Sequence, residues 1–280
     1  MAHPAPESLP LSVAIICRDN DDTIGRTLES LSSLGEIEIV GVDSGSSDGT
    51  IGLLERHGAR VVRQEWLGHV RQKQRALELC TRAWVLSLDS DESLESDLAV
   101  RVREAVVRDD PRVGGYALNR RVFYAGRLLD HAWQPEWRTR LVRRGLAAWG
   151  GYDPHDKLDL TGEARSRGLR IDRLPGVLRH DSMSSVTEFL ARQAAHARIA
   201  ARSYREMGRR GSVAKLVVSP LGAFLKQVVV RQAWRDGWRG WVAASATAAG
   251  ALMKHAALIE IGRVSEGRGG VAGDDGSGGV

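Results

Sequence analysis

The sequence has few residues of the kinds that mark small disulfide-rich or fibrous proteins. Among its 280 residues are two cysteines, Cys17 and Cys80, and aromatic side chains make up 5%. Two cysteines cannot build a disulfide framework or a cysteine-rich zinc site. Because both lie in apolar segments, we expect buried, reduced thiols. With 42% hydrophobic and 27% charged residues, the composition also excludes a disordered chain and a collagen-like repeat.

The sequence also lacks a recognisable leader and a long uninterrupted apolar run. The first ten residues, MAHPAPESLP, have neither the charged nor the apolar region of a signal peptide, so we expect no secretory signal. The most apolar segment, residues 213–230, is interrupted by Lys215, Pro220 and Lys226, and we expect no membrane-spanning helix there. These features predict a cytoplasmic protein.

Charge is divided unevenly along the chain. The formal net charge is +5, but residues 1–163 carry 21 Lys and Arg against 26 Asp and Glu, whereas residues 164–263 carry 18 against 6. An acidic front half could hold a metal ion, and a basic back half could face an anionic surface or substrate. For any single basic stretch, a solvated helix face remains an open alternative.

The first 110 residues alternate short apolar runs with amphipathic stretches, which is the pattern of βαβ units. Residues 11–17, 36–42, 59–62 and 84–88 are predicted strands, and residues 23–34, 70–80 and 94–107 are predicted helices, with Ser93 as a cap of the last. The pattern predicts an α/β fold with a doubly wound sheet. Such sheets bind ligands at the carboxyl ends of their strands, where polar clusters follow the first, second and fourth strands.

An acidic cluster, Asp89-Ser90-Asp91-Glu92, directly follows the fourth predicted strand. Carboxylate oxygens are ligands suited to Mg²⁺ or Mn²⁺, which would bridge to a diphosphate. An acidic turn that only caps the surface is the alternative.

A second cluster follows the second predicted strand and reads VDSGSSDGT. Its small residues would let a planar ligand approach the backbone, and Asp43 could accept hydrogen bonds from a base or ribose. A Gly-rich turn is the alternative, and we expect Asp48 mainly to cap the next helix.

Taken in order, these segments resemble a known family. RDNDDTIGRTLESL, VDSGSSDGT, GHVRQKQRALELCTRAWVLSLDSDE, WQPEWRTRLVRRG, PHDKL and LRHDSMSS are similar to segments of family 2 glycosyltransferases with the GT-A fold. More narrowly, they resemble the lipopolysaccharide-core β-glycosyltransferases of the WaaE/KdtX kind. The resemblance implies a GT-A type doubly wound mixed sheet, with a Rossmann-like nucleotide-binding half, followed by a helical region.

The resemblance also implies roles for single residues. Asp43 would contact the nucleotide base, Asp91 would bind a Mg²⁺ or Mn²⁺ ion, and Asp89 would lie nearer the ribose. Lys73 would neutralise donor phosphate, although Gln74 stands beside it where the family has Asn. Asp19 likewise stands where Asn is usual.

His155 and Asp156 resemble the family's His-Glu pair. An inverting transfer needs a base for the acceptor hydroxyl, and Asp156 is the candidate. His155 could orient it, touch the diphosphate or complete the metal shell; an ordinary polar turn is the alternative. Arg140 could grip the leaving diphosphate or an anionic acceptor, and for His180 core packing and chemistry both stay open.

Residues 182–263 are predicted to be basic and helical, after a glycosyltransferase domain at 11–181 and a short extension at 1–10. Residues 264–280 are predicted to be a disordered tail. Tryptophan recurs at i, i+4, i+7 and arginine at i, i+4, i+8, in a pattern that suits the water–lipid boundary: Trp234, Trp238, Trp241, Arg231, Arg235 and Arg239. Packing of these tryptophans inside the protein is the alternative.

The leading hypothesis is therefore a metal-dependent inverting glycosyltransferase in cell-envelope polysaccharide or lipopolysaccharide assembly. It would move a hexose from a nucleotide-diphosphate sugar, with UDP favoured, to a lipid- or glycan-linked acceptor, peripherally at the inner face of the cell membrane. An inactive binding protein on the same fold is a second hypothesis. A phosphoryl-transfer enzyme is a third, but the acids around Asp48-Gly49-Thr50 are wrongly spaced for it. We expect no nucleic-acid partner, because no known binding motif is present.

Overall fold

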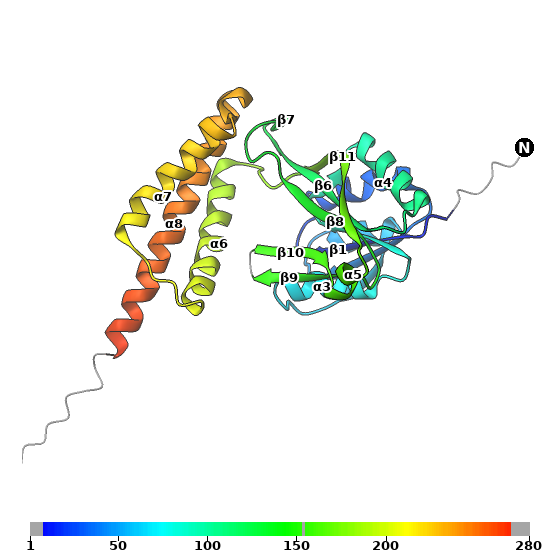
Figure 1. Cartoon of the computed structure of the whole chain (residues 1–280), viewed down its shortest axis with the longest axis horizontal. Helices are drawn as coiled ribbons and strands as arrows, with labels where there is room; N and C mark the ends of the chain where they lie inside the picture. The colour runs from blue at the N-terminus through cyan, green and yellow to red at the C-terminus, as the bar shows by residue number, and fades with distance from the viewer. Residues whose placement is uncertain (1–7, 153–154, 270–280) are drawn as a thin grey trace, which may run out of the picture. The chain divides into compact units, whose positions relative to one another are not determined.

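The structure of the chain is a computed structural model that describes residues 8–152 and 155–269 (Figure 1). It contains two compact units. Among the described residues, the sheet unit comprises residues 8–129, 134–152 and 155–183, and the helical unit comprises residues 130–133 and 184–269. The expected boundary between residues 181 and 182 stays a prediction.

The sheet unit is built on one mixed β-sheet with the strand order β3-β2-β1-β4-β8-β6-β11-β5, and β7 pairs with β6. Strands β1, β2, β3 and β4 are mutually parallel, β8 is antiparallel to β4 and β6, and β6 is parallel to β11. The predicted doubly wound mixed sheet is confirmed. The strands of this sheet are β1 (Leu11–Cys17), β2 (Glu38–Asp43), β3 (Arg60–Arg63), β4 (Trp84–Asp89), β5 (Glu92–Leu94), β6 (Val113–Tyr124), β7 (Arg127–Leu128), β8 (Trp137–Arg143) and β11 (Arg170–His180).

The register of the central strands brings the polar strand ends together. β1 lies between β2 and β4, with Cys17 opposite Asp43 and Ile16 opposite Asp89. Since parallel strands end at the same edge of a sheet, the clusters that follow β2 and β4 flank the end of β1. The helices of this unit are α1 (Ile24–Ser30), η1 (Ser32–Leu34), α2 (Thr50–Arg56), α3 (His69–Leu79), α4 (Ser96–Arg108) and α5 (Gly162–Ser166).

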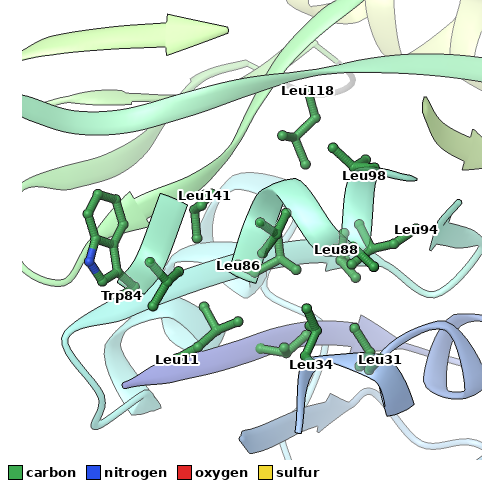
Figure 2. Close-up of a cluster of buried hydrophobic side chains, with 14 of the residues drawn as sticks. Leu11, Leu31, Leu34, Trp84, Leu86, Leu88, Leu94, Leu98, Leu118 and Leu141 are labelled. Atoms are coloured by element: carbon green, nitrogen blue, oxygen red, sulfur yellow. The ribbon is translucent and has the colours of Figure 1, made fainter. Parts of the chain in front are cut away.

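Large side chains fill the space between the sheet and α4 (Figure 2). Trp84, Leu86 and Leu118 are fully buried there. Trp84 keeps its polar edge satisfied, because its indole Nε1 donates to Asp109 at 2.9 Å and the Arg143 guanidinium lies 4.5 Å from its ring. Burying each large apolar side chain stabilises the fold by about 1.5–3 kcal/mol, so this cluster holds the strand ends in place.

A separate hairpin joins β9 (Ala147–Tyr152) to β10 (His155–Leu160), with Asp156 opposite Gly151. Trp149 of this hairpin donates its backbone N–H to Gln74 on α3 at 2.9 Å. The hairpin therefore carries Asp156 toward α3.

Some predicted boundaries were wrong. Ser93 is not a helix cap: it lies in β5, which pairs antiparallel with β11, and the N-cap of α4 is Glu95. That pairing joins residues distant in sequence, so local pattern does not reveal it. The helix predicted over residues 23–34 is broken after Ser30 and ends in the turn η1.

The helical unit contains α6 (Val186–Glu206), α7 (Val213–Leu225), a π-helical turn η2 (Lys226–Val230), η3 (Ala233–Asp236) and α8 (Trp238–Gly269). α8 passes the expected start of the disordered tail at residue 264, where the next residues contain no proline to stop a helix. The remainder of that expected tail, residues 270–280, lies outside the described residues.

Two segments of this unit are long and apolar enough to cross a membrane, judged by length and composition alone. They are Val213–Val230 and Trp238–Gly262, with mean hydropathies of 1.6 and 1.3. We expected no spanning helix because Lys215, Pro220 and Lys226 interrupt the apolar run. The mean hydropathy of the whole segment stays high despite these three residues. Helices of soluble proteins pass the same test, so the finding is weak by itself.

A loop that follows β7 is tied to the turn between α7 and α8. Asp236 is buried, and its carboxylate accepts hydrogen bonds from the backbone N–H groups of Asp130, His131 and Ala132 at 2.8–3.0 Å. Burial alone would raise the pKa of Asp236, but these hydrogen bonds lower it. This carboxylate thus fixes residues 130–132 to the helical unit.

Candidate active site

The acidic turn after β4 is held by a hydrogen bond within the turn and by contacts from two other segments. Asp89 donates its backbone N–H to the Glu92 carboxylate at 3.1 Å, which closes the turn. Thr27 of α1 donates its hydroxyl to the carbonyl of Ser90 at 3.0 Å, and Asp181 donates its backbone N–H to the carbonyl of Asp91 at 2.9 Å. The turn is therefore a fixed platform for its carboxylates.

Asp89 lies between two cations. Its carboxylate is 2.7 Å from Lys73 Nζ and 2.9 Å from Arg140 Nη2. Burial alone would raise the pKa of Asp89, but Lys73 and Arg140 lower it far below its usual range. The group is a carboxylate at every physiological pH.

Glu92 and Trp149 are the site residues that our sequence analysis did not single out. Glu92 is fully buried and binds Arg140 through two hydrogen bonds, of 2.7 and 2.9 Å, while Arg120 reaches it at 3.2 Å. The signal for Glu92 was its place in the acidic cluster. Trp149 lies against both cations, 4.7 Å from Lys73 Nζ and 5.6 Å from the Arg140 guanidinium, and no spacing in the sequence indicates that contact.

Lys73 joins the acidic turn to the hairpin. Its ammonium is 2.8 Å from the Asp156 carboxylate and 2.7 Å from that of Asp89, and the lysine side chain is buried. Both acids keep some exposure to solvent, 16% for the side chain of Asp156 and 23% for that of Asp89. One cation therefore lies between two carboxylates that a ligand can reach.

Asp91 has a different partner. His180, the last residue of β11, places its Nε2 3.4 Å from the Asp91 carboxylate. Burial alone would raise the pKa of Asp91, but His180 lowers it. The other ring nitrogen of His180, Nδ1, is buried and makes no hydrogen bond to any described residue.

The side chains at this turn could hold a divalent cation only together with ligands supplied by a bound substrate. In the described part of the chain, no three His, Cys, Asp or Glu side chains form a group that could hold an ion by themselves. Asp91 and the His180 Nε2 would supply two ligands at most. Mg²⁺ is commonly held by one or two carboxylates plus substrate phosphates, so the site fits an ion that arrives with a diphosphate.

Asp43 is buried and serves its own loop. Its carboxylate accepts the backbone N–H groups of Gly45 and Ser46 at 2.9–3.2 Å, and the Ser46 hydroxyl as well. Cys17 lies 3.8 Å away, and burial, with Asp43 adding to it, raises the pKa of its thiol to about 12. Contact of Asp43 with a base therefore stays a prediction.

Two neighbouring residues shape the same loop. Asp48 accepts the backbone N–H of Thr50, the first residue of α2, at 3.0 Å, but the N-cap of α2 is Gly49, so Asp48 supports the start of the helix from one residue before the predicted cap position. Asp19 has a positive φ of 49°, and its carboxylate accepts the Ser47 N–H at 2.8 Å. Asp and Asn are the residues that tolerate this backbone conformation best after Gly, which accounts for Asp where Asn is usual.

The structure thus brings four of the seven predicted site residues into one ion-paired network: Lys73, Asp89, Arg140 and Asp156. Asp91 follows on the same turn, and Asp43 lies at the end of β2. The side chain of His155 is outside the described residues, although its backbone pairs with Tyr152 in the hairpin.

A doubly wound sheet with parallel strands β3-β2-β1-β4, followed by antiparallel strands and an acidic turn after β4, defines an α/β protein of the GT-A fold. Residues 12–152 match the model of the family described as glycosyl transferase family 2. The lipopolysaccharide core biosynthesis glycosyltransferase LpsC of Rhizobium meliloti is 30% identical over 264 residues, covering 90% of this chain and 93% of LpsC. The chain belongs to glycosyl transferase family 2, and it is a glycosyltransferase.

Weaker similarities also extend over most of the chain. An uncharacterized glycosyltransferase, RP128, of Rickettsia prowazekii is 25% identical over 83% of this chain and 80% of its own length. Among solved structures, the mannosyltransferase PcManGT of Pyrobaculum calidifontis, in complex with GDP-Man and Mn²⁺, is 19% identical. It covers 95% of this chain and 82% of its own, with a TM-score of 0.47.

Proposed function

We propose that this glycosyltransferase moves a hexose from a nucleotide-diphosphate sugar to a hydroxyl group of a lipid- or glycan-linked acceptor in lipopolysaccharide or related envelope polysaccharide assembly. The similarity to LpsC over nearly the full length of both chains supports the acceptor class. UDP-hexose is the favoured donor. The observation that carries the proposal is the pair of carboxylates, Asp89 and Asp156, gathered on Lys73 at the strand ends.

Asp156 is the proposed catalytic base. The acceptor hydroxyl oxygen attacks the anomeric carbon from the face opposite the diphosphate, and its proton passes to the Asp156 carboxylate. The bond from the anomeric carbon to the diphosphate oxygen breaks, and the nucleoside diphosphate leaves with the electron pair. The anomeric configuration inverts in this single displacement.

Lys73 would hold the two carboxylates apart and in place. Its ammonium lies within hydrogen-bond distance of both, so it can stay on Asp156 while a donor phosphate approaches the Asp89 side. The Arg140 guanidinium already donates hydrogen bonds to two carboxylates of the protein, those of Asp89 and Glu92. This favours a role in positioning these acids over direct binding of the diphosphate.

A divalent ion, Mg²⁺ or Mn²⁺, is proposed at Asp91. When bound, such an ion would neutralise the diphosphate and favour its departure. Asp91 would supply a carboxylate oxygen, and His180 lies close enough to supply a nitrogen. Asp43 would contribute by shaping the loop that meets the nucleotide base, and His155 by orienting Asp156 or touching the diphosphate.

The proposed location is the cytoplasm, with peripheral contact at the inner face of the cell membrane. Trp234, Trp238 and Trp241 are about half exposed, and the Arg239 guanidinium lies 4.9 Å from the Trp238 ring. Arg231 precedes Trp234 along the chain, and Arg235 follows it. Tryptophan beside arginine suits the headgroup layer of a membrane, where a lipid-linked acceptor is presented.

Calorimetric titration of UDP, GDP and ADP into the purified protein, with and without Mn²⁺, tests the donor site. We expect one nucleotide to bind tightly only with the metal, and Asp91→Ala to abolish that binding. Asp97→Ala, which removes an exposed acid from the nearby helix α4, should leave it unchanged. Equally tight binding without metal would remove the metal site from the proposal.

A further inference from the structure

One face of the helical unit is apolar although it is exposed to solvent. α7, every residue of which is described, buries none of its side chains. Val217, Leu221, Leu225 and Val229 recur every four residues along α7 and η2, and each is exposed by 47–67%. On a helix that faces water this outward stripe would be polar. We call these four residues the α7 stripe.

Basic residues surround the α7 stripe, and acids are nearly absent. Residues 207–259 contain a single acid, Asp236, which is buried in its contact with residues 130–132. Lys215 and Lys226 are exposed near the two ends of α7. The same segment contains eight basic residues: Arg209, Arg210, Lys215, Lys226, Arg231, Arg235, Arg239 and Lys254.

An apolar stripe between basic ends is complementary to an anionic lipid surface. Lysine side chains can bury their apolar stems beside the stripe while the ammonium groups reach the phosphates. Each Lys or Arg near an anionic membrane contributes about 1 kcal/mol, and insertion of the aliphatic side chains adds hydrophobic burial.

The packing of the three long helices decides between lying on the membrane and spanning it. α6 runs parallel to α8, with Gln193 against Gly250 and Arg205 against Gly262, and α7 runs the opposite way, with Phe224 against Trp241 (Figure 1). α6 is therefore alongside the stretch of α8 that would cross the bilayer.

The charges on α6 oppose a crossing at that depth. Arg192, Arg198 and Arg202 are exposed on α6 over the same length. An arginine at the centre of a spanning helix costs about 2.5–3.5 kcal/mol on insertion scales. Three of them would offset the benefit of inserting α8.

We infer that α7 and η2 lie flat in the headgroup layer of an anionic phospholipid membrane, with the α7 stripe inserted and no helix crossing. The proposed tryptophan contact names no inserted helix. The α7 stripe supplies one and sets its orientation in the membrane. It does not depend on the proposed donor chemistry.

Flotation of the full-length protein with phosphatidylcholine vesicles, with and without phosphatidylglycerol, tests the inference. We expect the protein to float with the anionic vesicles and to be released from them by alkaline carbonate, which does not extract spanning proteins. Val217→Glu should weaken vesicle binding about tenfold or more, because it removes inserted apolar area and adds a repelled charge.

Val107→Glu is the matched control. Val107 lies on α4 of the sheet unit and is exposed by 66%, against 67% for Val217, so the same substitution meets the same solvent. It should float like the wild type, and both variants should keep nucleotide binding in the calorimeter. Failure of nucleotide binding in every form would affect the proposed function and leave the vesicle result standing.

Several results would overturn the inference. They are absence of flotation, equal flotation on vesicles without phosphatidylglycerol, and wild-type flotation by Val217→Glu. Resistance to carbonate would mean that a helix spans the membrane. A wild-type dimer in sedimentation that Val217→Glu converts to a monomer would instead mean that the α7 stripe is covered by a second copy of the chain.

Discussion

At the scale of single residues, Lys73 has partners from two distant parts of the chain. Asp89 lies at the end of β4, and Asp156 lies on β10, 83 residues from the lysine. The ammonium compensates both charges at once, and the Trp149 ring lies against it.

Lys73→Met should lower the turnover number about 10²-fold, the usual effect of removing one charged or hydrogen-bonding group from a reaction centre. The two carboxylates would then lose the cation between them, and Asp89 would keep only its pair with Arg140. Lys157→Met is the control, since Lys157 is exposed and follows Asp156 on the same strand, where alternate side chains point to opposite faces. Steady-state kinetics of both variants, with thermal melts to verify folding, measure the effect; equal turnover of Lys73→Met and wild type would contradict this role.

A site residue could be predicted from the sequence where its contacts are made by residues close to it in the chain. Asp89 and Asp91 were identifiable because they directly follow an apolar strand. The proximity of Lys73 to Asp156 has no local signature, since an α3 residue and a hairpin residue meet only in the folded sheet unit. Glu92 was hidden for the same reason, because its burial depends on the pairing of β5 with β11.

At the scale of elements, ion pairs tie β6 to the segment that leads into β8. Glu136 accepts hydrogen bonds from Arg120 of β6 at 2.7 and 3.1 Å and from Arg138 of β8 at 2.7 and 3.1 Å. Burial alone would raise the pKa of Glu136, but the two arginines lower it to about 2. Arg120 also contacts Glu92, so this pairing extends to the acidic turn.

Glu136→Gln should lower the free energy of unfolding at neutral pH by about 1–3 kcal/mol, because a charge-assisted partner of two arginines is lost. In the folded state the pKa of Glu136, about 2, lies below the ordinary value of 4.5. The stabilisation is therefore complete above pH 4.5 and is lost as the pH falls toward 2. Urea unfolding of the variant and wild type across that range should show the difference shrinking with acidity.

Glu104→Gln is the control for that measurement. Glu104 forms an exposed pair with Arg101 on α4, and such pairs contribute little. A difference for Glu136→Gln that stays constant from neutral pH down to pH 2 would contradict the assigned pairing.

The helices of the basic half show a different limit of prediction at this scale. Their helical character and the Trp and Arg spacing were evident from periodicity. Their outward face was not, because a helix that is apolar on several sides has no periodic signal that tells which side packs inward. The packing of α7 against α8 alone leaves Val217 and Leu221 outside.

At the scale of the whole molecule, the division of charge coincides with the division into units. The acidic front half forms most of the sheet unit, which holds the carboxylates and belongs to glycosyl transferase family 2. The basic back half forms most of the helical unit, whose α7 stripe and lysines fit an anionic membrane. The proposed donor chemistry and the proposed membrane contact thus fall on separate parts of one chain.

A turnover assay of Asp156→Asn shows whether the Asp156 carboxylate is the base of glycosyl transfer, as we propose. The assay follows release of UDP from UDP-hexoses in the presence of a lipid-linked oligosaccharide acceptor, with UDP binding measured in parallel. Asp159→Asn, on the same strand with its side chain paired to Arg165, is the control. We expect Asp156→Asn to bind UDP like the wild type and to lose about 10²–10⁴-fold in turnover, whereas Asp159→Asn should keep both. Wild-type turnover by Asp156→Asn would mean that Asp156 is not the base.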